Sequence, residues 1–200
     1  MNSLAVLCHT FNNYEWLWDG FLHGWRTHVG DLPYRQLLGT DTPYHKPHVL
    51  GPFEYLYSGT GEWSNRLRSL IKKIDEEYIF YIQEDMWPSA PPPDLRQLLQ
   101  LTVDKDLLRL QVAPVTRLYT LQGGGYPVYF SMTSKYLVSH QPSIWRKDFL
   151  MQCLQPEESP WTNEYEGTKR LANQKQYANR IAIYPHDWFR HKCEKGKFVE

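Results

Sequence analysis

Residues 78–85 of the chain read Tyr78-Ile-Phe-Tyr-Ile-Gln-Glu-Asp85 and are followed by Met86-Trp-Pro88. A continuous apolar run of this length predicts a strand buried on both faces, as in a parallel sheet. Glu84 and Asp85 then stand where that strand leaves the sheet, and open α/β folds bind their ligands outside the carboxyl ends of strands. Two carboxylates at this edge are costly unless they meet a cation or a polar substrate, although they are also compatible with a solvated turn.

The segments around this strand predict an alternation of strands and helices. Strands are expected at 4–8, 34–38, 107–112 and 181–184, helices at 14–28, 64–74, 93–103 and 144–154, and a hairpin around the glycines 123–125. Ser64 and Ser143 are expected to cap two of the helices. This order predicts an α/β fold of one domain, residues 1–200, with a mostly parallel central sheet flanked by helices.

The composition gives no sign of a general attraction to nucleic acid or membranes. Lys plus Arg equal Asp plus Glu at 22 each, so no net charge recruits nucleic acid or membrane. A basic run at Arg190, His191, Lys192, Lys195 and Lys197 is either a local anion-binding patch or a solvated tail. Three cysteines without close metal-type spacing, no signal peptide and no apolar span predict a reduced, cytoplasmic protein without a transmembrane segment.

Familiar nucleotide-binding and hydrolase motifs are missing from the sequence. It contains no Gly-X-Gly-X-X-Gly fingerprint, no phosphate-loop motif and no Gly-X-Ser-X-Gly elbow. The spacing of His186, Asp187, His191 and Cys193 matches no closed zinc pattern. The acids after residue 83 therefore remain the leading candidates, because hard oxygen ligands at a strand end suit Mg²⁺ or Mn²⁺ with substrate phosphates completing the shell.

Three stretches resemble the glycosyltransferases of the GT-A type, especially the small enzymes of bacterial polysaccharide assembly and of phages. They are Trp63–Leu67 leading into 78–85, Ser139–Leu150, and Glu158–Glu164. The resemblance spans roughly residues 1 to 170. It implies a Rossmann-like GT-A domain in which 1–90 form the nucleotide-binding half and 91–200 the acceptor-side half. The family usually carries Asp-X-Asp, whereas this chain has Glu-Asp, in which Asp85 fills the last acidic position.

The resemblance implies a donor site and a metal site. Donor-binding residues would be His9, Thr10, Phe11, Asn12, Asp41, Arg66, Glu84, Lys195 and Lys197. Asp85 and Glu84, with His191 as a further ligand, would hold Mn²⁺ or Mg²⁺ against the diphosphate. His186 is an alternative to His191, and the basic residues Arg190, Lys195 and Lys197 are an alternative to the metal. The loop at His9 is equally compatible with an ordinary connection between a strand and a helix.

The resemblance also implies catalytic and acceptor residues. Asp85 would be catalytic through the metal, and Glu164 would act as the base that takes the acceptor proton if the reaction inverts, with Glu166 as a near alternative. Acceptor-binding residues would be Gln141, Ser143, Trp145 and Trp161. Trp145 and Trp161 are also compatible with a role in the core, and Glu164 with a surface position.

The expected function is therefore transfer of a sugar from a nucleotide sugar, with UDP favoured, to a hydroxyl acceptor. The acceptor would be a polysaccharide, a lipid-linked glycan, or a hydroxymethylated pyrimidine in phage DNA. Two alternatives remain at this point: a non-catalytic nucleotide- or glycan-binding protein of the same fold, and a metal-dependent nucleotidyltransferase. The latter usually shows a second acid on a neighbouring strand, for which the sequence offers no clear candidate.

Overall fold

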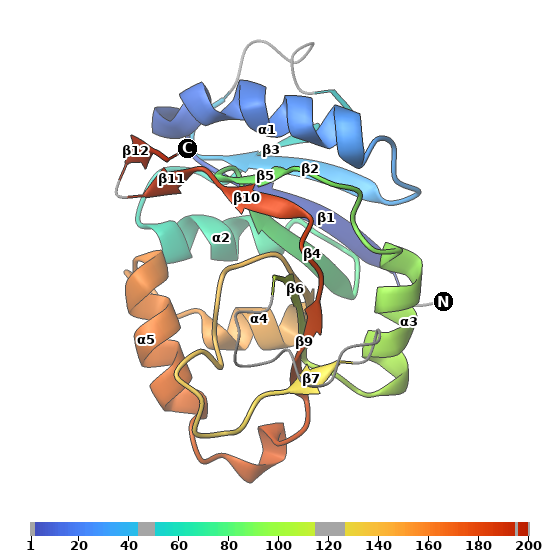
Figure 1. Ribbon diagram of the computed structural model, residues 1–200. Coiled ribbons are helices and arrows are strands. Elements are labelled where there is room, and N and C mark those ends of the chain that lie inside the picture. Colours follow the sequence, from blue (N-terminus) through green and yellow to red (C-terminus); the bar gives the residue numbers. More distant parts are fainter. Residues whose placement is uncertain (1–2, 44–50, 115–126, 195, 200) are drawn as a thin grey trace.

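The computed structural model describes residues 3–43, 51–114, 127–194 and 196–199, and it confirms the α/β fold with a central sheet (Figure 1). Eight strands form this sheet in the order β3-β2-β1-β4-β8-β6-β9-β7. Their bounds are β1 Leu4–His9, β2 Arg35–Thr40, β3 Glu54–Tyr57, β4 Tyr78–Gln83, β6 Arg109–Ala113, β7 Val128–Tyr129, β8 Ser143–Arg146 and β9 Ile181–Pro185. The sheet is mostly parallel, because β7 and β8 alone among these strands run antiparallel to their neighbours.

Helices cover both faces of the sheet, as the continuous apolar strands predict. One face carries α1 (Glu15–His28) and α3 (Leu95–Asp104), and the other carries α2 (Trp63–Ile71), α4 (Lys147–Cys153) and α5 (Pro160–Leu171). In β1 the side chains of Leu4, Val6 and Cys8 enter the first core, whereas Ala5 and Leu7 enter the second. Because successive side chains of a strand point to opposite faces, the sheet has a separate core on each of its two faces. The described residues also form two short 3₁₀ helices, η1 (Asn12–Tyr14) and η4 (Lys175–Tyr177).

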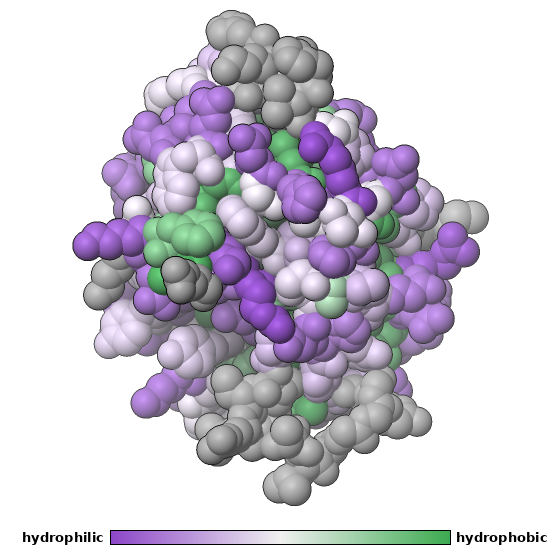
Figure 2. Space-filling model, turned by 45° about the horizontal axis from the view of Figure 1, so that its top comes forward, coloured by the Kyte–Doolittle hydropathy of each residue, from purple (hydrophilic) through white to green (hydrophobic). Residues whose placement is uncertain are grey.

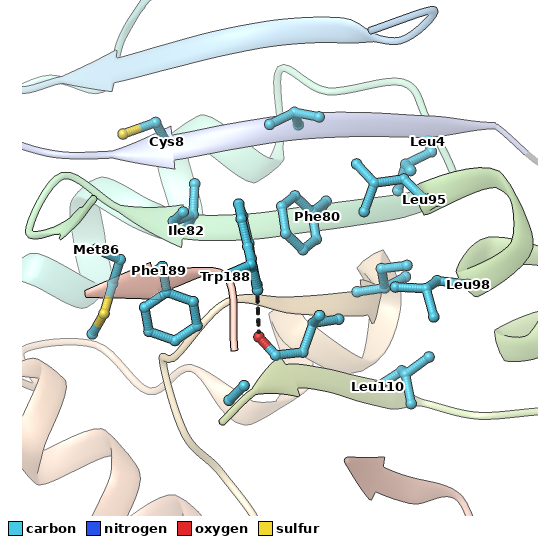
Figure 3. Packing of buried hydrophobic residues seen from close by; sticks show 14 of the residues in the cluster. Leu4, Cys8, Phe80, Ile82, Met86, Leu95, Leu98, Leu110, Trp188 and Phe189 are labelled. Carbon is cyan, nitrogen blue, oxygen red and sulfur yellow. Dashed lines mark hydrogen bonds between the residues drawn. The ribbon is translucent and has the colours of Figure 1, made fainter. Parts of the chain in front are cut away.

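The C-terminal segment returns to the carboxyl end of β4. Its strand β10 (Phe189–His191) pairs antiparallel with β5 (Met86–Pro88), and β11 (Cys193–Glu194) pairs with β12 (Lys197–Phe198). The fully buried Trp188 anchors this return: its indole packs near Phe80, and its Nε1–H donates to the Val112 carbonyl over 3.2 Å (Figure 3). This anchor brings His191 next to the acids that follow β4.

Helix α1 approaches β5 closely at its glycines. A Cβ added at Gly24 would lie 2.5 Å from the carbonyl oxygen of Pro88, and one at Gly20 would lie 1.9 Å from the Trp87 ring. Both distances are shorter than any normal carbon contact. The two glycines therefore set the distance between α1 and the strand that supports the C-terminal segment.

Three local expectations were wrong, each because tertiary packing outweighed a local signal. Ser143 starts strand β8 rather than capping a helix, since Ile144 and Trp145 point into opposite cores at a period of two. Glu62, not Ser64, occupies the N-cap of α2, and the Ser64 Oγ instead accepts the backbone N–H of Glu158 over 2.9 Å. Strand β3 is not among the strands expected from the sequence, since the surrounding stretch 41–61 is rich in proline and glycine. The expected hairpin around 123–125 falls outside the described residues.

Candidate functional site

A cavity of about 570 Å³ opens at the carboxyl ends of β1 and β4, where an open α/β sheet binds its ligands. Its walls come from the loop after β1, the start of α2, the residues after β4, the loop before β8, the start of α5 and the C-terminal segment. On the face shown in Figure 2, hydrophilic side chains dominate and hydrophobic ones are exposed only in small separate areas. A pocket of this size, lined by both aromatic and charged groups, suits a polar ligand with flat rings.

Two adjacent acids, Glu84 and Asp85, follow β4 and line this cavity. Glu84 is only 5% exposed, and burial together with the neighbouring Asp85 charge raises the pKa of its carboxyl well above the usual value. The Oδ2 of Asp85 lies 3.0 Å from the Nε2 of His191, and its buried Oδ1 has no hydrogen-bond partner among the described residues. A buried acid next to a half-buried one with an unused oxygen favours the binding of a cation.

These residues fit a divalent metal that takes part of its shell from its ligand. Within the described ranges, no three His, Cys, Asp or Glu side chains already converge on one point as a metal site. Mg²⁺ needs only one or two protein carboxylates when phosphates and water supply the other ligands. Asp85, Glu84 and His191 all line the cavity, so this partial set is compatible with an ion bound together with a diphosphate.

The loop after β1 forms the wall expected for a donor. His9, Thr10 and Phe11 line the cavity, and the Thr10 hydroxyl is fixed by the Nε1–H of Trp18 at 2.8 Å. Asn12 does not line the cavity: its backbone N–H donates to Asp41 Oδ1 over 2.8 Å. Asn12 and Asp41 therefore stabilise the loop after β1 without lining the cavity.

Arg66 is the one Lys or Arg side chain that lines the cavity in the described part of the chain. Its guanidinium lies 4.7 Å from the centre of the Phe11 ring. Burial lowers its pKa, while the charges of Asp41 and Glu84 oppose that change. A mostly buried guanidinium across from two acids suits the anionic part of a ligand.

Four buried rings form the floor between the donor loop and α5. The His9 ring lies 5.8 Å from Trp63, and Trp63 lies 4.4 Å from His140, measured between ring centres. Tyr81 contacts both histidines, with its hydroxyl 3.3 Å from the His9 Nδ1. Burial lowers the pKa of both imidazoles, that of His140 to about 3, so both rings are neutral near pH 7.

The start of α5 brings Glu164 to the opposite wall. Ser159 caps this helix by accepting the Thr162 N–H over 3.1 Å, and Pro160 occupies its first turn. The Oε1 of Glu164 accepts the backbone N–H of His140 over 2.6 Å. The carboxylate is thus held at the cavity wall by a neutral main-chain donor.

The buried Arg109 holds the loop that carries His140. It is 0% exposed, has no carboxylate within ion-pair distance among the described residues, and donates to the carbonyls of Leu137 at 3.0 Å and Tyr136 at 3.3 Å. Burial lowers its pKa to about 10. Its role could not be read from the sequence, because Arg109 falls inside an apolar strand with no motif around it.

The expected acceptor residues divide into two groups. Gln141 and Trp161 line the cavity, and Trp161 is 69% exposed at its rim. The expectation for Ser143 and Trp145 is corrected, because both are fully buried outside the cavity lining. The Ser143 hydroxyl donates to the Gln141 carbonyl over 2.7 Å, and Trp145 stacks between His140 and Phe149.

The basic C-terminal residues contribute little to the cavity. Lys197 is exposed on β12 and does not line it, so its expected donor contact is not supported, and Lys195 lies outside the described residues. Arg190 pairs with Asp187, and neither Arg190 nor His186 lines the cavity. Tyr14, His140 and Cys193 also line the cavity, although none of them was assigned a role there from the sequence. His140 lies within Ser139–Leu150, one of the stretches that resemble the GT-A enzymes.

Comparison with solved structures places the fold. S. aureus TarS 1–349 in complex with UDP-GlcNAc matches with a TM-score of 0.64 and 14% identity, over 98% of this chain and 60% of that chain. Glucosyl-3-phosphoglycerate synthase from Mycobacterium tuberculosis matches with a TM-score of 0.60 and 7% identity, over 96% of this chain and 73% of that one. CMP:2-keto-3-deoxy-manno-octonic acid synthetase complexed with CTP matches with a TM-score of 0.59 and 14% identity, over 98% and 94%.

The chain therefore has the GT-A-like fold of nucleotide-sugar transferases. It spans about 60% of the length of the TarS 1–349 chain. No protein-family model and no curated protein matches the sequence. No helix in the described ranges has the length and apolar character required to cross a bilayer.

Proposed function

We propose that the protein is a glycosyltransferase that moves a sugar from a nucleotide diphosphate sugar, with UDP favoured, to a hydroxyl acceptor. One observation carries this proposal: Glu84 and Asp85 after β4 and Glu164 of α5 line a single cavity on a GT-A-like sheet. The two groups supply the two requirements of the reaction, which are a site for the diphosphate leaving group and a base for the acceptor. The UDP and UDP-GlcNAc complexes of TarS support the choice of nucleotide.

In this proposal, the residues of the cavity hold the donor and the base. The loop at His9–Phe11 holds the nucleoside, and Arg66 binds the anionic diphosphate. Glu164 takes the proton of the acceptor hydroxyl as that oxygen attacks the anomeric carbon. The His140 N–H keeps the carboxylate in place while the proton moves.

Asp85, Glu84 and His191 are proposed to hold Mn²⁺ or Mg²⁺. The bound ion would neutralise the negative charge of the diphosphate leaving group. The support is the raised pKa of Glu84, caused by burial and by Asp85, because an acidic pair in this state gains stability when a cation binds it.

The acceptor is proposed to be a glycan, either a polysaccharide or a lipid-linked chain. Trp161 offers an exposed ring at the cavity rim, and an aromatic face of this kind stacks on a sugar. A modified pyrimidine in DNA is the lesser proposal, because Arg66 is the one Lys or Arg in the described cavity lining and phosphate binding relies on several such cations.

A second candidate function is nucleotidyl transfer. The match to the CTP-bound synthetase covers 94% of that chain, a larger share than is covered of TarS 1–349. That reaction would use a nucleoside triphosphate and release pyrophosphate. Pyrophosphate release in the presence of CTP or UTP and a panel of sugars separates it from glycosyl transfer.

The first experiment is a thermal-shift panel with UDP, GDP, CMP and CTP, each with and without Mn²⁺. A ligand that binds the folded state alone raises the free energy of unfolding by about 2.7 kcal/mol at a hundredfold excess over Kd, and Tm rises accordingly. A metal-dependent shift with one nucleoside diphosphate supports the transferase. A shift with CTP alone supports the second candidate, and no shift supports a non-catalytic protein.

Asp85→Asn tests the metal site within the same panel. We expect it to remove the metal-dependent shift and sugar transfer while leaving Tm without ligand nearly unchanged, because the substitution keeps the volume of the side chain. Asp19→Asn is the matched control, since Asp19 is an exposed acid on α1 outside the cavity. Unchanged turnover in Asp85→Asn would contradict the metal assignment.

A further inference from the structure

The hydrogen bonds behind His140 have a fixed direction. The Asn163 Nδ2 donates to the Cys153 carbonyl at 2.9 Å and to Glu158 Oε2 at 2.5 Å, and Arg170 pairs with the same Glu158 at 2.7 Å. Both partners of this NH₂ group are acceptors, so a flipped amide would place oxygen against oxygen. The Asn163 Oδ1 must therefore face His140, 2.8 Å from its Nε2.

This direction fixes the tautomer of His140. Because Asn163 Oδ1 can only accept, the Nε2 of His140 carries the hydrogen and its Nδ1 is left as a bare acceptor. That Nδ1 is buried and has no partner among the described residues, although the ring lines the cavity. An unpaired buried acceptor in a ligand cavity favours a ligand that donates a hydrogen bond.

A second chain of hydrogen bonds fixes the neighbouring Gln141. The guanidinium of Arg109 can only donate, and it donates to Gln111 Oε1. The Gln111 Nε2 then donates to Gln141 Oε1 over 2.9 Å. The carbonyl end of the Gln141 amide is thus occupied, and its NH₂ end is the end available to a ligand in the cavity that Gln141 lines.

We propose that His140 Nδ1 and Gln141 Nε2 form an acceptor–donor pair of fixed polarity that recognises one neutral group of the donor sugar. Such a group must both donate and accept, as a hydroxyl or an acetamido group does. The pair lies where the reacting sugar of the proposed transferase would be, because the His140 ring packs on Trp63 beside His9 and its backbone holds Glu164. This inference rests on the proposed function.

The tautomer is tested first, in the protein without ligand. The ¹⁵N shifts of a histidine ring distinguish a nitrogen that carries hydrogen from a bare one, and the signals of His140 are identified by their loss in His140→Gln. We expect a bare Nδ1, an Nε2 with hydrogen, and no titration between about pH 8 and pH 5, since the pKa is held to about 3. A hydrogen on Nδ1, or titration in this range, overturns the proposal.

Recognition of the sugar is tested by the affinities for UDP, UDP-glucose and UDP-GlcNAc with Mn²⁺. The amide nitrogen of a glutamine can occupy the position of the histidine Nε2, so His140→Gln keeps the bond to Asn163 and removes the acceptor. We expect it to weaken binding of the recognised UDP-sugar by about threefold to tenfold and to leave UDP binding unchanged. Gln141→Met, which removes the donor, should have the same sugar-specific effect.

Control variants separate recognition from folding. His23→Gln makes the same exchange on the exposed side of α1 and should change neither affinity. His140→Asn, whose amide can place an oxygen near the lost Nδ1, should retain more sugar affinity than His140→Gln even where it unfolds more easily. Loss with UDP-glucose as well as UDP-GlcNAc identifies a hydroxyl, and loss with UDP-GlcNAc alone identifies the acetamido group.

The failures of the two proposals are distinguishable. If the unaltered protein binds UDP and a UDP-sugar, but His140→Gln weakens both equally or neither, the recognition pair is wrong and the proposed function stands. If the unaltered protein binds no nucleotide sugar, the proposed function is wrong. The proposed role of His140 and Gln141 in sugar recognition is then wrong as well, whatever tautomer the ¹⁵N shifts show.

Discussion

The backbone N–H of His140 donates to Oε1 of Glu164 over 2.6 Å, so the candidate base on α5 is held by the loop that carries the candidate sugar-recognition residues. A backbone N–H keeps its proton and takes no part in proton transfer, whereas a carboxylate can accept a proton from the acceptor hydroxyl. The contact therefore fixes the position of Glu164 without competing for its proton.

Glu164→Gln should reduce turnover by about 10²–10⁴-fold with little change in KM for the donor, because the amide cannot accept the acceptor's proton. The fold should persist, since the Gln oxygen can still accept from His140. Steady-state kinetics with the nucleotide sugar found in the thermal-shift panel measure the effect. The matched control is Glu166→Gln, whose native carboxylate pairs with Lys169 at 3.0 Å outside the cavity. Equal losses in both variants would remove Glu164 from the mechanism.

Arg109→Met should destabilise the protein by about 2–4 kcal/mol, because the carbonyls of Tyr136 and Leu137 lose their buried donor. Urea unfolding measures the change. Arg35→Met is the control, since Arg35 forms a largely exposed ion pair with Glu54 and such pairs contribute about 0–1 kcal/mol. A change for Arg109→Met no larger than this control would show that the loop does not depend on the buried guanidinium.

Stability should fall as the solution is acidified below about pH 6.5. Burial lowers the pKa of His140 in the folded state to about 3, so in this range the unfolded chain binds a proton that the folded protein does not. One such group costs about 1.4 kcal/mol per pH unit, or about 2 kcal/mol between pH 6.5 and pH 5. His9, whose pKa burial also lowers, acts in the same direction. Urea unfolding at several pH values should show a shallower slope for His140→Gln, and an unchanged slope would assign the proton uptake elsewhere.

Gly24→Ala should destabilise the protein by about 1–3 kcal/mol, although alanine normally stabilises a helix interior by about 1 kcal/mol relative to glycine. The new methyl group would lie 2.5 Å from the Pro88 carbonyl, a backbone atom that cannot move aside cheaply. Thermal or urea unfolding gives the sign of the effect. A stabilised variant would show that α1 can shift away from β5.

The elements with strong apolar patterns were predictable from the sequence. The strand Tyr78–Gln83 and helix α1 follow from their apolar periodicity, whereas the GT-A-like fold was expected from the resemblance to the glycosyltransferases. Strand β8 was not predictable as a strand, because its antiparallel position between β4 and β6 comes from the pairing of distant segments. A four-residue run before a helix carries no local signal that distinguishes a strand from a cap.

The candidate site was predictable to the extent that its residues follow strand ends or begin a helix. The resemblance implied one site for Glu84, Asp85, Glu164 and the loop at His9–Asn12, and all of these except Asn12 line the cavity. Trp145 was assigned to the acceptor because its burial depends on β8, which the sequence did not reveal. His140 and Arg109 were missed because their roles arise from hydrogen-bond chains between segments that are far apart in the sequence.

The return of β10 to β5 has a consequence for biosynthesis. The cavity is lined both by the loop at His9 and by His191 and Cys193, so its wall joins segments that lie far apart in the sequence. A nascent chain can form the β1-β2-β4 part of the sheet long before residue 191 leaves the ribosome, but it cannot complete the wall until then. Ligand binding should therefore be acquired only after His191 and Cys193 have left the ribosome, later than the folding of the β1-β2-β4 part of the sheet.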